Sequence, residues 1–153
     1  MEVPFFELTS QYKSIKPEID QAIHEVFECG VFIRGEKTKA FEKAFAQAIG
    51  TKCCIGVGNG TDALFLILKA FGVSEGDEVI TPAFSWISSS ETITQCGAKP
   101  VFADVDPDFY TLDPIDVEKK ITPNTKAIIA VHLYGQVADM NILRSLCEKH
   151  NLK

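Results

Sequence analysis

The sequence predicts an α/β fold in which helices cover both faces of a mainly parallel sheet. Short apolar segments alternate along the chain with segments whose apolar residues follow helical spacing, and this alternation is typical of parallel sheets. Residues 126–131 are rich in Ile, Ala and Val without an apolar–polar alternation, as expected for a strand buried on both faces. The sequence contains no repeat or low-complexity tract, so nothing in it marks a linker.

Two helices are predicted within residues 1–50. Residues 17–29 carry apolar side chains at helical spacing, with Pro17 suited to a first turn and Gly30 to a stop. Residues 36–49 repeat the pattern, and Gly50 ends it. Residues 1–50 are therefore predicted to form an N-terminal helical segment.

Residues 51–153 are predicted to form an incomplete α/β domain. The expected strands are 53–57, 78–81, 101–105 and 126–131. The expected helices are 62–71, 86–96, 114–121 and 139–151, the third capped by Asp113 with Pro114 at its first position. A further strand is expected to start at 152–153, so the sheet looks open and the chain looks cut.

The composition excludes several classes of protein. The net charge is −6 and the lysines are scattered among acidic residues, so nucleic acid is not an expected partner. No apolar run approaches the roughly 20 residues of a membrane span, and no secretory signal precedes the first helix. The five cysteines form an odd set without a CxxC pair, which argues against a disulfide framework or a metal site. We therefore expect a cytoplasmic protein with buried, reduced thiols.

The sharpest local signal is the glycine-rich segment 56–64, which follows a predicted strand and opens a predicted helix. Unpaired N–H groups and a partial positive charge at a helix N-terminus can hold a phosphate. Gly58 and Gly60 would let the backbone approach an anion, and Thr61 could cap the helix and offer a hydroxyl. The carboxylate of Asp62 would repel a phosphate, so its side chain should cap the helix or point away. A plain Asn-Gly turn before a capped helix would explain the same residues.

Trp86 follows the next predicted strand. In open α/β sheets, ligands bind beyond the carboxyl ends of the strands, and a planar indole there could stack on a flat heterocycle. A packed core tryptophan is the alternative. A phosphate loop and an aromatic side chain after successive strands together suggest a phosphorylated ring cofactor.

Several motifs occur in one order along nearly the whole chain: Phe32-Ile33-Arg34-Gly35, Asn59-Gly60-Thr61-Asp62-Ala63-Leu64, Gly76-Asp77-Glu78-Val79-Ile80-Thr81-Pro82, Pro100-Val101-Phe102-Ala103-Asp104-Val105-Asp106 and Val131-His132-Leu133-Tyr134-Gly135. Together they resemble the DegT/StrS-type family of nucleotide-sugar aminotransferases. The resemblance implies the N-terminal part of the large domain of a fold-type I aminotransferase, with pyridoxal 5'-phosphate (PLP) as the cofactor.

The resemblance also implies roles for individual residues. Backbone groups of Gly60, Thr61 and Asp62 would hold the PLP phosphate, and Trp86 would stack on the pyridine ring. The substrates would be a nucleotide-linked keto-sugar and an amino-acid donor, commonly glutamate, and two subunits would share active sites in a homodimer. The carboxylate for the ring nitrogen and the lysine that bonds to the cofactor would lie beyond Lys153, so no catalytic residue is assigned within the chain and an inactive fragment is expected.

Three alternatives remain open at this stage. One is a sugar dehydratase of the same family with a histidine in place of the lysine, another is a non-enzymatic regulatory protein, and the third is an unrelated nucleotide-binding α/β domain. His132 and Tyr134 lie where a strand should end, and a structural histidine with a packed tyrosine is preferred over a role at the rim of an active site. Asp104 and Asp106 are expected to serve their own loop.

Overall fold

The computed structural model describes residues 3–153, and the chain divides into two compact units, Met1–Gly56 and Val57–Lys153. The first unit contains two helices, α1 (Thr9–Cys29) and α2 (Glu36–Ile49). Both end at a glycine in the left-handed conformation, Gly30 and Gly50, where other residues would be strained. The stops of both predicted helices and the start of α2 are confirmed.

The start predicted for α1 is wrong. The helix begins eight residues earlier than expected, and Pro17 lies inside it rather than in its first turn. The Glu7 carboxylate accepts the Ser10 N–H at 3.0 Å and so satisfies one free donor at the helix start. A proline inside a helix removes one hydrogen bond, and α1 continues through Pro17 nonetheless.

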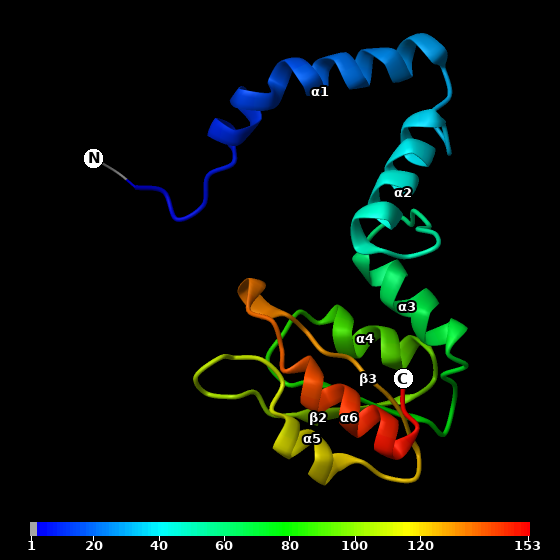
Figure 1. Ribbon diagram of the computed structural model, residues 1–153, viewed down its shortest axis with the longest axis vertical. Coiled ribbons are helices and arrows are strands. Elements are labelled where there is room, and N and C mark those ends of the chain that lie inside the picture. The colour runs from blue at the N-terminus through cyan, green and yellow to red at the C-terminus, as the bar shows by residue number, and fades with distance from the viewer. Residues whose placement is uncertain (1–2) are drawn as a thin grey trace. The chain divides into compact units, whose positions relative to one another are not determined.

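The second unit is a parallel sheet with helices on both faces, so the predicted fold class is confirmed (Figure 1). The sheet has the order β2-β1-β3, and both pairs are parallel. Its strands are β1 (Glu78–Pro82), β2 (Lys99–Ala103) and β3 (Thr125–Ile128). The helices are α3 (Gly60–Ala70), α4 (Ser88–Gln95), α5 (Pro114–Lys120) and α6 (Met140–His150), and η1 (Leu133–Gly135) is a short 3-10 turn.

Neighbouring residues of β1 point into two separate cores. Val79 packs with Leu68 of α3 and Ile93 of α4, whereas Ile80 packs with Val117 of α5 and residues of α6. Successive side chains of a strand alternate between the faces of a sheet. Both faces are therefore covered, as the apolar segment 126–131 predicts, and every residue of β1 is buried.

Two predicted strands need correction. Residues 53–57 form no strand, because a strand requires a hydrogen-bonding neighbour and none of the described chain pairs with this segment. The third strand of the sheet is shorter than predicted and ends at Ile128, although Ile129 still donates its N–H to the Ile80 carbonyl. Residues 129–132 then leave the sheet and line a cleft.

The last residue already pairs with β3. The Lys153 N–H donates to the Lys126 carbonyl, and the Lys153 carbonyl accepts the Ile128 N–H. This pattern places Lys153 beside Ala127 as a parallel neighbour, although residues 152–153 form no strand in the structure, so the strand expected there stays a prediction. Within residues 3–153, no helix combines the length and apolar content needed to cross a membrane.

Candidate functional site

The candidate site is an open cleft of about 450 Å³ in the second unit, at the carboxyl ends of β1 and β3. Three of the four residues predicted to bind a cofactor line it together, namely Gly60, Thr61 and Trp86. Asp62 does not line it. The remaining walls come from α3, from the loop before α4 and its first turn, and from the segment that follows β3: Leu64, Ser85, Ser88, Ser89, Ile129, Ala130, Val131 and His132.

Asn59, and not Thr61, caps helix α3. The Asn59 side-chain oxygen accepts the Asp62 N–H at 2.9 Å, and its amide nitrogen donates to the Asp62 carboxylate at 3.1 Å. The prediction that Thr61 caps the helix is therefore wrong, because an asparagine two residues earlier is a stronger cap than a threonine. The N–H groups of Gly60 and Thr61 have no acceptor among the described residues, so the helix opens onto the cleft with two free donors.

Asp62 turns its carboxylate away from the cleft. A Cβ on Gly58 would lie 2.7 Å from the Asp62 carboxylate oxygen, so the glycine at position 58 makes room for that side chain. By contrast, a Cβ on Gly60 would meet nothing within 4 Å. The expected conflict between this carboxylate and a bound anion is thus reduced by the side chain's direction, while its N–H is already engaged with Asn59.

Four hydroxyl-bearing residues line the cleft, namely Thr61, Ser85, Ser88 and Ser89. The Thr61 and Ser88 hydroxyl oxygens lie 2.7 Å apart and join the starts of α3 and α4. The Ser85 hydroxyl is buried and has no hydrogen-bond partner among the described residues. A buried polar group without a partner costs about 1–3 kcal/mol, so Ser85 offers an unmet hydrogen bond to a ligand in the cleft. Sequence reasoning missed Ser85 and Ser88, although they flank the singled-out Trp86.

Trp86 is solvent-exposed and borders the cleft. Its side chain is 77% exposed, and it precedes α4, which begins at Ser88. A buried core tryptophan, the alternative interpretation, is therefore wrong. An exposed indole at the rim of a cleft presents a flat apolar face on which a ring can stack.

His132 and Tyr134 follow β3 but differ in environment. The His132 Nδ1 accepts the Ala138 N–H at 3.1 Å, which fixes the ring and, in the neutral form, leaves the proton on Nε2. This confirms a structural hydrogen bond for the histidine, which also lines the cleft. Tyr134 is 85% exposed with a φ of 55°, so the expectation of a packed tyrosine is wrong.

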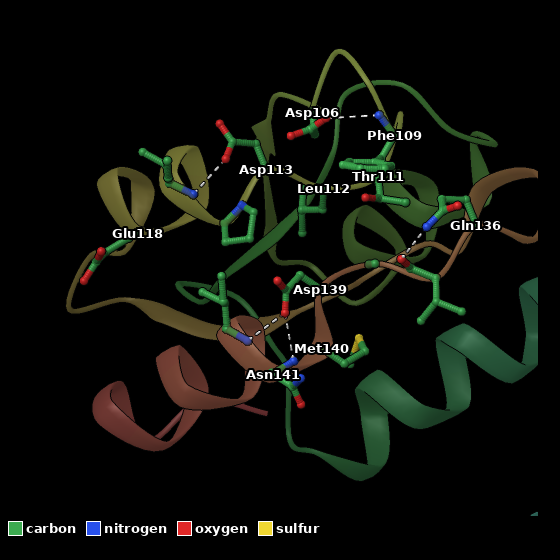
Figure 2. Close-up of a pocket in the computed structure, with 15 residues that line it drawn as sticks. Asp106, Phe109, Thr111, Leu112, Asp113, Glu118, Gln136, Asp139, Met140 and Asn141 are labelled. Atoms are coloured by element: carbon green, nitrogen blue, oxygen red, sulfur yellow. Dashed lines mark hydrogen bonds between the residues drawn. The ribbon is translucent and has the colours of Figure 1, made fainter.

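A larger hollow of about 760 Å³ lies beside α5 and α6 (Figure 2). Its three aspartates serve the backbone: Asp113 accepts the Ile115 N–H, Asp139 accepts two N–H groups of α6, and Asp106 accepts two in its own loop. The Glu118 carboxylate pairs with Lys149 at 2.7 Å. The loop role expected of Asp106 is thus confirmed. The described residues hold no cluster of three or more His, Cys, Asp or Glu suited to a metal. This hollow contains none of the predicted cofactor residues.

The cysteines are less buried than expected. Cys96 is buried, Cys54 and Cys147 are partly buried, and Cys29 and Cys53 are exposed. All five are free thiols. Burial raises the pKa of the Cys147 thiol, which keeps that group protonated.

The donor set of the cleft suits a phosphorylated aromatic ring. The two free amides and the hydroxyls can bind phosphate oxygens, and the unpartnered Ser85 hydroxyl and the exposed Trp86 lie on the same cleft. No lysine or arginine is among its lining residues. An anion would therefore be held by backbone dipoles and uncharged donors.

Comparison with known proteins gives a consistent result. Residues 13–153 match the model of the DegT/DnrJ/EryC1/StrS aminotransferase family. The chain is 45% identical to a "pleiotropic regulatory protein" of Geobacillus stearothermophilus, over 99% of the chain and 41% of that protein. It is 44% identical to a UDP-2-acetamido-2-deoxy-3-oxo-D-glucuronate aminotransferase of Pseudomonas aeruginosa, over 98% of the chain and 42% of the enzyme.

Solved structures share the fold. The DesV protein of S. venezuelae, crystallised in complex with a ketimine intermediate, superposes with a TM-score of 0.95 at 43% identity, over 98% of this chain and 40% of DesV. The NtdA protein of Bacillus subtilis, with bound cofactor PMP, gives a TM-score of 0.94 at 33% identity, over 99% of this chain and 35% of NtdA. The chain thus spans about two fifths of the curated relatives it matches. On these matches, the chain belongs to the DegT/DnrJ/EryC1/StrS aminotransferase family.

Proposed function

We propose that the protein carrying this chain is a PLP-dependent aminotransferase that moves an amino group from an amino-acid donor, glutamate, to a nucleotide-linked keto-sugar. Residues 51–153 would form an incomplete PLP-binding domain, with no catalytic residue of their own. The observation that carries the proposal is one cleft in which the free amides of Gly60 and Thr61 and the indole of Trp86 occur together. The relative from Pseudomonas aeruginosa, named for a UDP-linked 3-oxo-sugar, supports the substrate class.

In the proposed holoenzyme, this chain binds and orients the cofactor. Gly60 and Thr61 would hold the phosphate through their N–H groups, and Asp62 would contribute by fixing the first turn of α3 with Asn59. Trp86 would cover one face of the ring and exclude water from it. When bound, PLP supplies the electron sink that transamination needs. The carboxylate for the ring nitrogen and the lysine would come from chain beyond Lys153, and the protein would act as a cytoplasmic homodimer.

The test uses the whole protein with PLP. We expect an absorption band near the border of the visible and ultraviolet that disappears on borohydride reduction, and formation of 2-oxoglutarate from glutamate only with a keto-sugar nucleotide present. Trp86→Ala should weaken PLP binding about tenfold, given the worth of aromatic stacking. Phe84→Ala is the matched control, since that side chain is also exposed but does not line the cleft.

A regulatory role is the second candidate, favoured by the name of the relative from Geobacillus stearothermophilus. The same spectra decide between the two. A protein without a reducible band and without 2-oxoglutarate formation would contradict the aminotransferase proposal and favour the regulatory one.

A further inference from the structure

We propose that Ser88 is a positioning residue that aims the Thr61 hydroxyl proton at an anion bound in the cleft. The inference rests on the proposed function, because it assigns a role in holding the phosphate of the cofactor. It concerns a side chain contact that neither the sequence motifs nor the backbone donors account for. The contact joins two residues 27 positions apart, at the starts of two different helices.

Burial decides which hydroxyl donates within this pair. Both residues line the cleft, but Ser88 is only 7% exposed, whereas Thr61 is partly buried. Their 2.7 Å contact is the only hydrogen bond of either hydroxyl among the described residues. If Thr61 donated, the free proton would lie on the more buried of the two hydroxyls, which is the costlier arrangement. The geometry fits either oxygen as the donor, and we assign that role to Ser88, which donates to Thr61.

The direction of that bond leaves the Thr61 proton free to enter the cleft. A hydroxyl that accepts a hydrogen bond becomes a stronger donor, because hydrogen bonds in a chain polarise one another. The backbone N–H of Thr61 also has no acceptor among the described residues and lies in the first turn of α3. Thr61 thus presents two donors to one anion, and Ser88 sets the direction of the second.

The rigidity of α4 supports this role. The Ser88 carbonyl accepts the hydroxyl of Thr92 at 2.8 Å, and Thr92 is fully buried. The serine therefore sits on a helix whose first turn is tied down. Because no lysine or arginine lines the cleft, each uncharged donor carries a larger share of the binding energy than it would beside a cation.

The test is a double-mutant cycle in the whole protein, with inorganic phosphate and PLP as separate ligands. Thr61→Val should weaken both about tenfold, as expected for a hydrogen bond to a charged group, and Thr61→Ser should retain most of the affinity. Ser88→Ala should cost roughly threefold alone and nothing further in the Thr61→Val background, since its effect acts through Thr61. The ³¹P resonance of the bound phosphate should shift in Ser88→Ala as it does in Thr61→Val.

Ser90→Ala is the control on the same helix, because the Ser90 hydroxyl bonds the Ile87 carbonyl and lies outside the cleft. Ser88→Cys, nearly isosteric but a weak donor, replaces Ser88→Ala if the latter unfolds. Equal losses from the Ser88 change in both backgrounds, or no loss at all, would overturn the inference.

The two proposals fail in different ways. A wild-type protein that binds phosphate with the predicted coupling but does not bind PLP sinks the proposed function and leaves the role of Ser88 standing. Binding of PLP without coupling sinks only the role of Ser88. Binding of neither ligand overturns both.

Discussion

The two units of the chain differ in how they bury apolar residues. In the first unit, among the described residues, Ala46 is the one buried apolar side chain, while Ile23, Phe27 and Phe32 are exposed. The second unit contains both core clusters, one on each face of the sheet. Burial of apolar surface is the dominant favourable term in folding. Helical periodicity therefore predicts the helices of both units but not which unit carries its own core.

The two units also differ in how often a side chain caps the start of a helix. In the first unit, neither α1 nor α2 has a capping side chain at its N-cap residue. In the second unit, three of the four α-helices, α3, α5 and α6, are capped by Asn59, Asp113 and Asp139, whereas α4 has no side-chain cap. Each such cap contributes about 1 kcal/mol. The second unit is thus specified both by its core and by its local hydrogen bonds.

The largest expected effect comes from emptying the core of the second unit. Ile80→Ala should lower the free energy of unfolding by about 2–5 kcal/mol, because the side chain is fully buried and leaves a cavity. Ile23→Ala, at a half-exposed position of the first unit, should change it by less than about 0.5 kcal/mol. Urea unfolding followed by circular dichroism measures both. Equal losses at the two positions would contradict the contrast between the units.

A smaller, pH-dependent effect is expected at Glu78, a buried carboxylate at the start of β1. Thr122 donates to it at 2.6 Å and Lys99 pairs with it at 2.9 Å. The Thr122 hydrogen bond and then the Lys99 contact hold the pKa of Glu78 below its usual range. A depressed carboxylate pKa contributes stability that is present above the unfolded-state pKa and is lost as the pH falls through the folded-state pKa.

Glu78→Gln should therefore reduce stability at neutral pH and flatten its decline in acid. The measurement is the urea midpoint of the variant and the parent between neutral and acidic pH. Glu91→Gln, on the exposed side of α4, is the control. A Glu78→Gln protein whose stability falls with acid as steeply as the parent's would refute this assignment.

The next effect concerns the caps. Asp139→Ala should cost about 1 kcal/mol, since its carboxylate accepts the Asn141 and Ile142 N–H groups. Asp20→Ala, on the surface of α1, removes only an exposed pair with Lys16 and should cost a few tenths of a kcal/mol. Thermal melts of the two variants compare them directly. Equal losses of stability in Asp139→Ala and Asp20→Ala would contradict a stabilising role of the Asp139 cap.

The smallest perturbation is chemical labelling, which leaves stability unchanged at low occupancy. Cys29 and Cys53 of the first unit should react quickly with a thiol reagent, because both are exposed. Cys96 of the second unit should react only after unfolding, since it belongs to a core cluster. Mass spectrometry of partially labelled protein gives the order. Early modification of Cys96 would show that this core opens readily.

The sequence predicted the elements whose signals are local. The start and end of α2, the Asp113 cap and the parallel sheet follow from periodicity, capping chemistry and apolar strands. Gly60, Thr61 and Trp86, which the sequence singled out together, do line one cleft, although the segment before Gly60 is not a strand of the sheet.

Most of the features that were missed depend on partners outside their own segment, and one depends on the choice between two neighbouring caps. Residues 53–57 look like a strand, but pairing is not a property of the segment alone. Asn59, rather than Thr61, is the N-cap residue of α3, and two hydrogen bonds between Asn59 and Asp62 stabilise this cap. The Thr61–Ser88 contact joins residues far apart in the chain, and no spacing rule for a single element reveals it.

Trp86 has a practical consequence as the single tryptophan of these 153 residues. Excitation selective for indole is confined, within this chain, to one fluorophore at the rim of the cleft, in contact with solvent. Quenching or a blue shift of its emission would signal an arriving ligand without any added dye. The residue proposed to cover the ring would thus also be an intrinsic fluorescence probe of ligand binding, suitable for stopped-flow measurements.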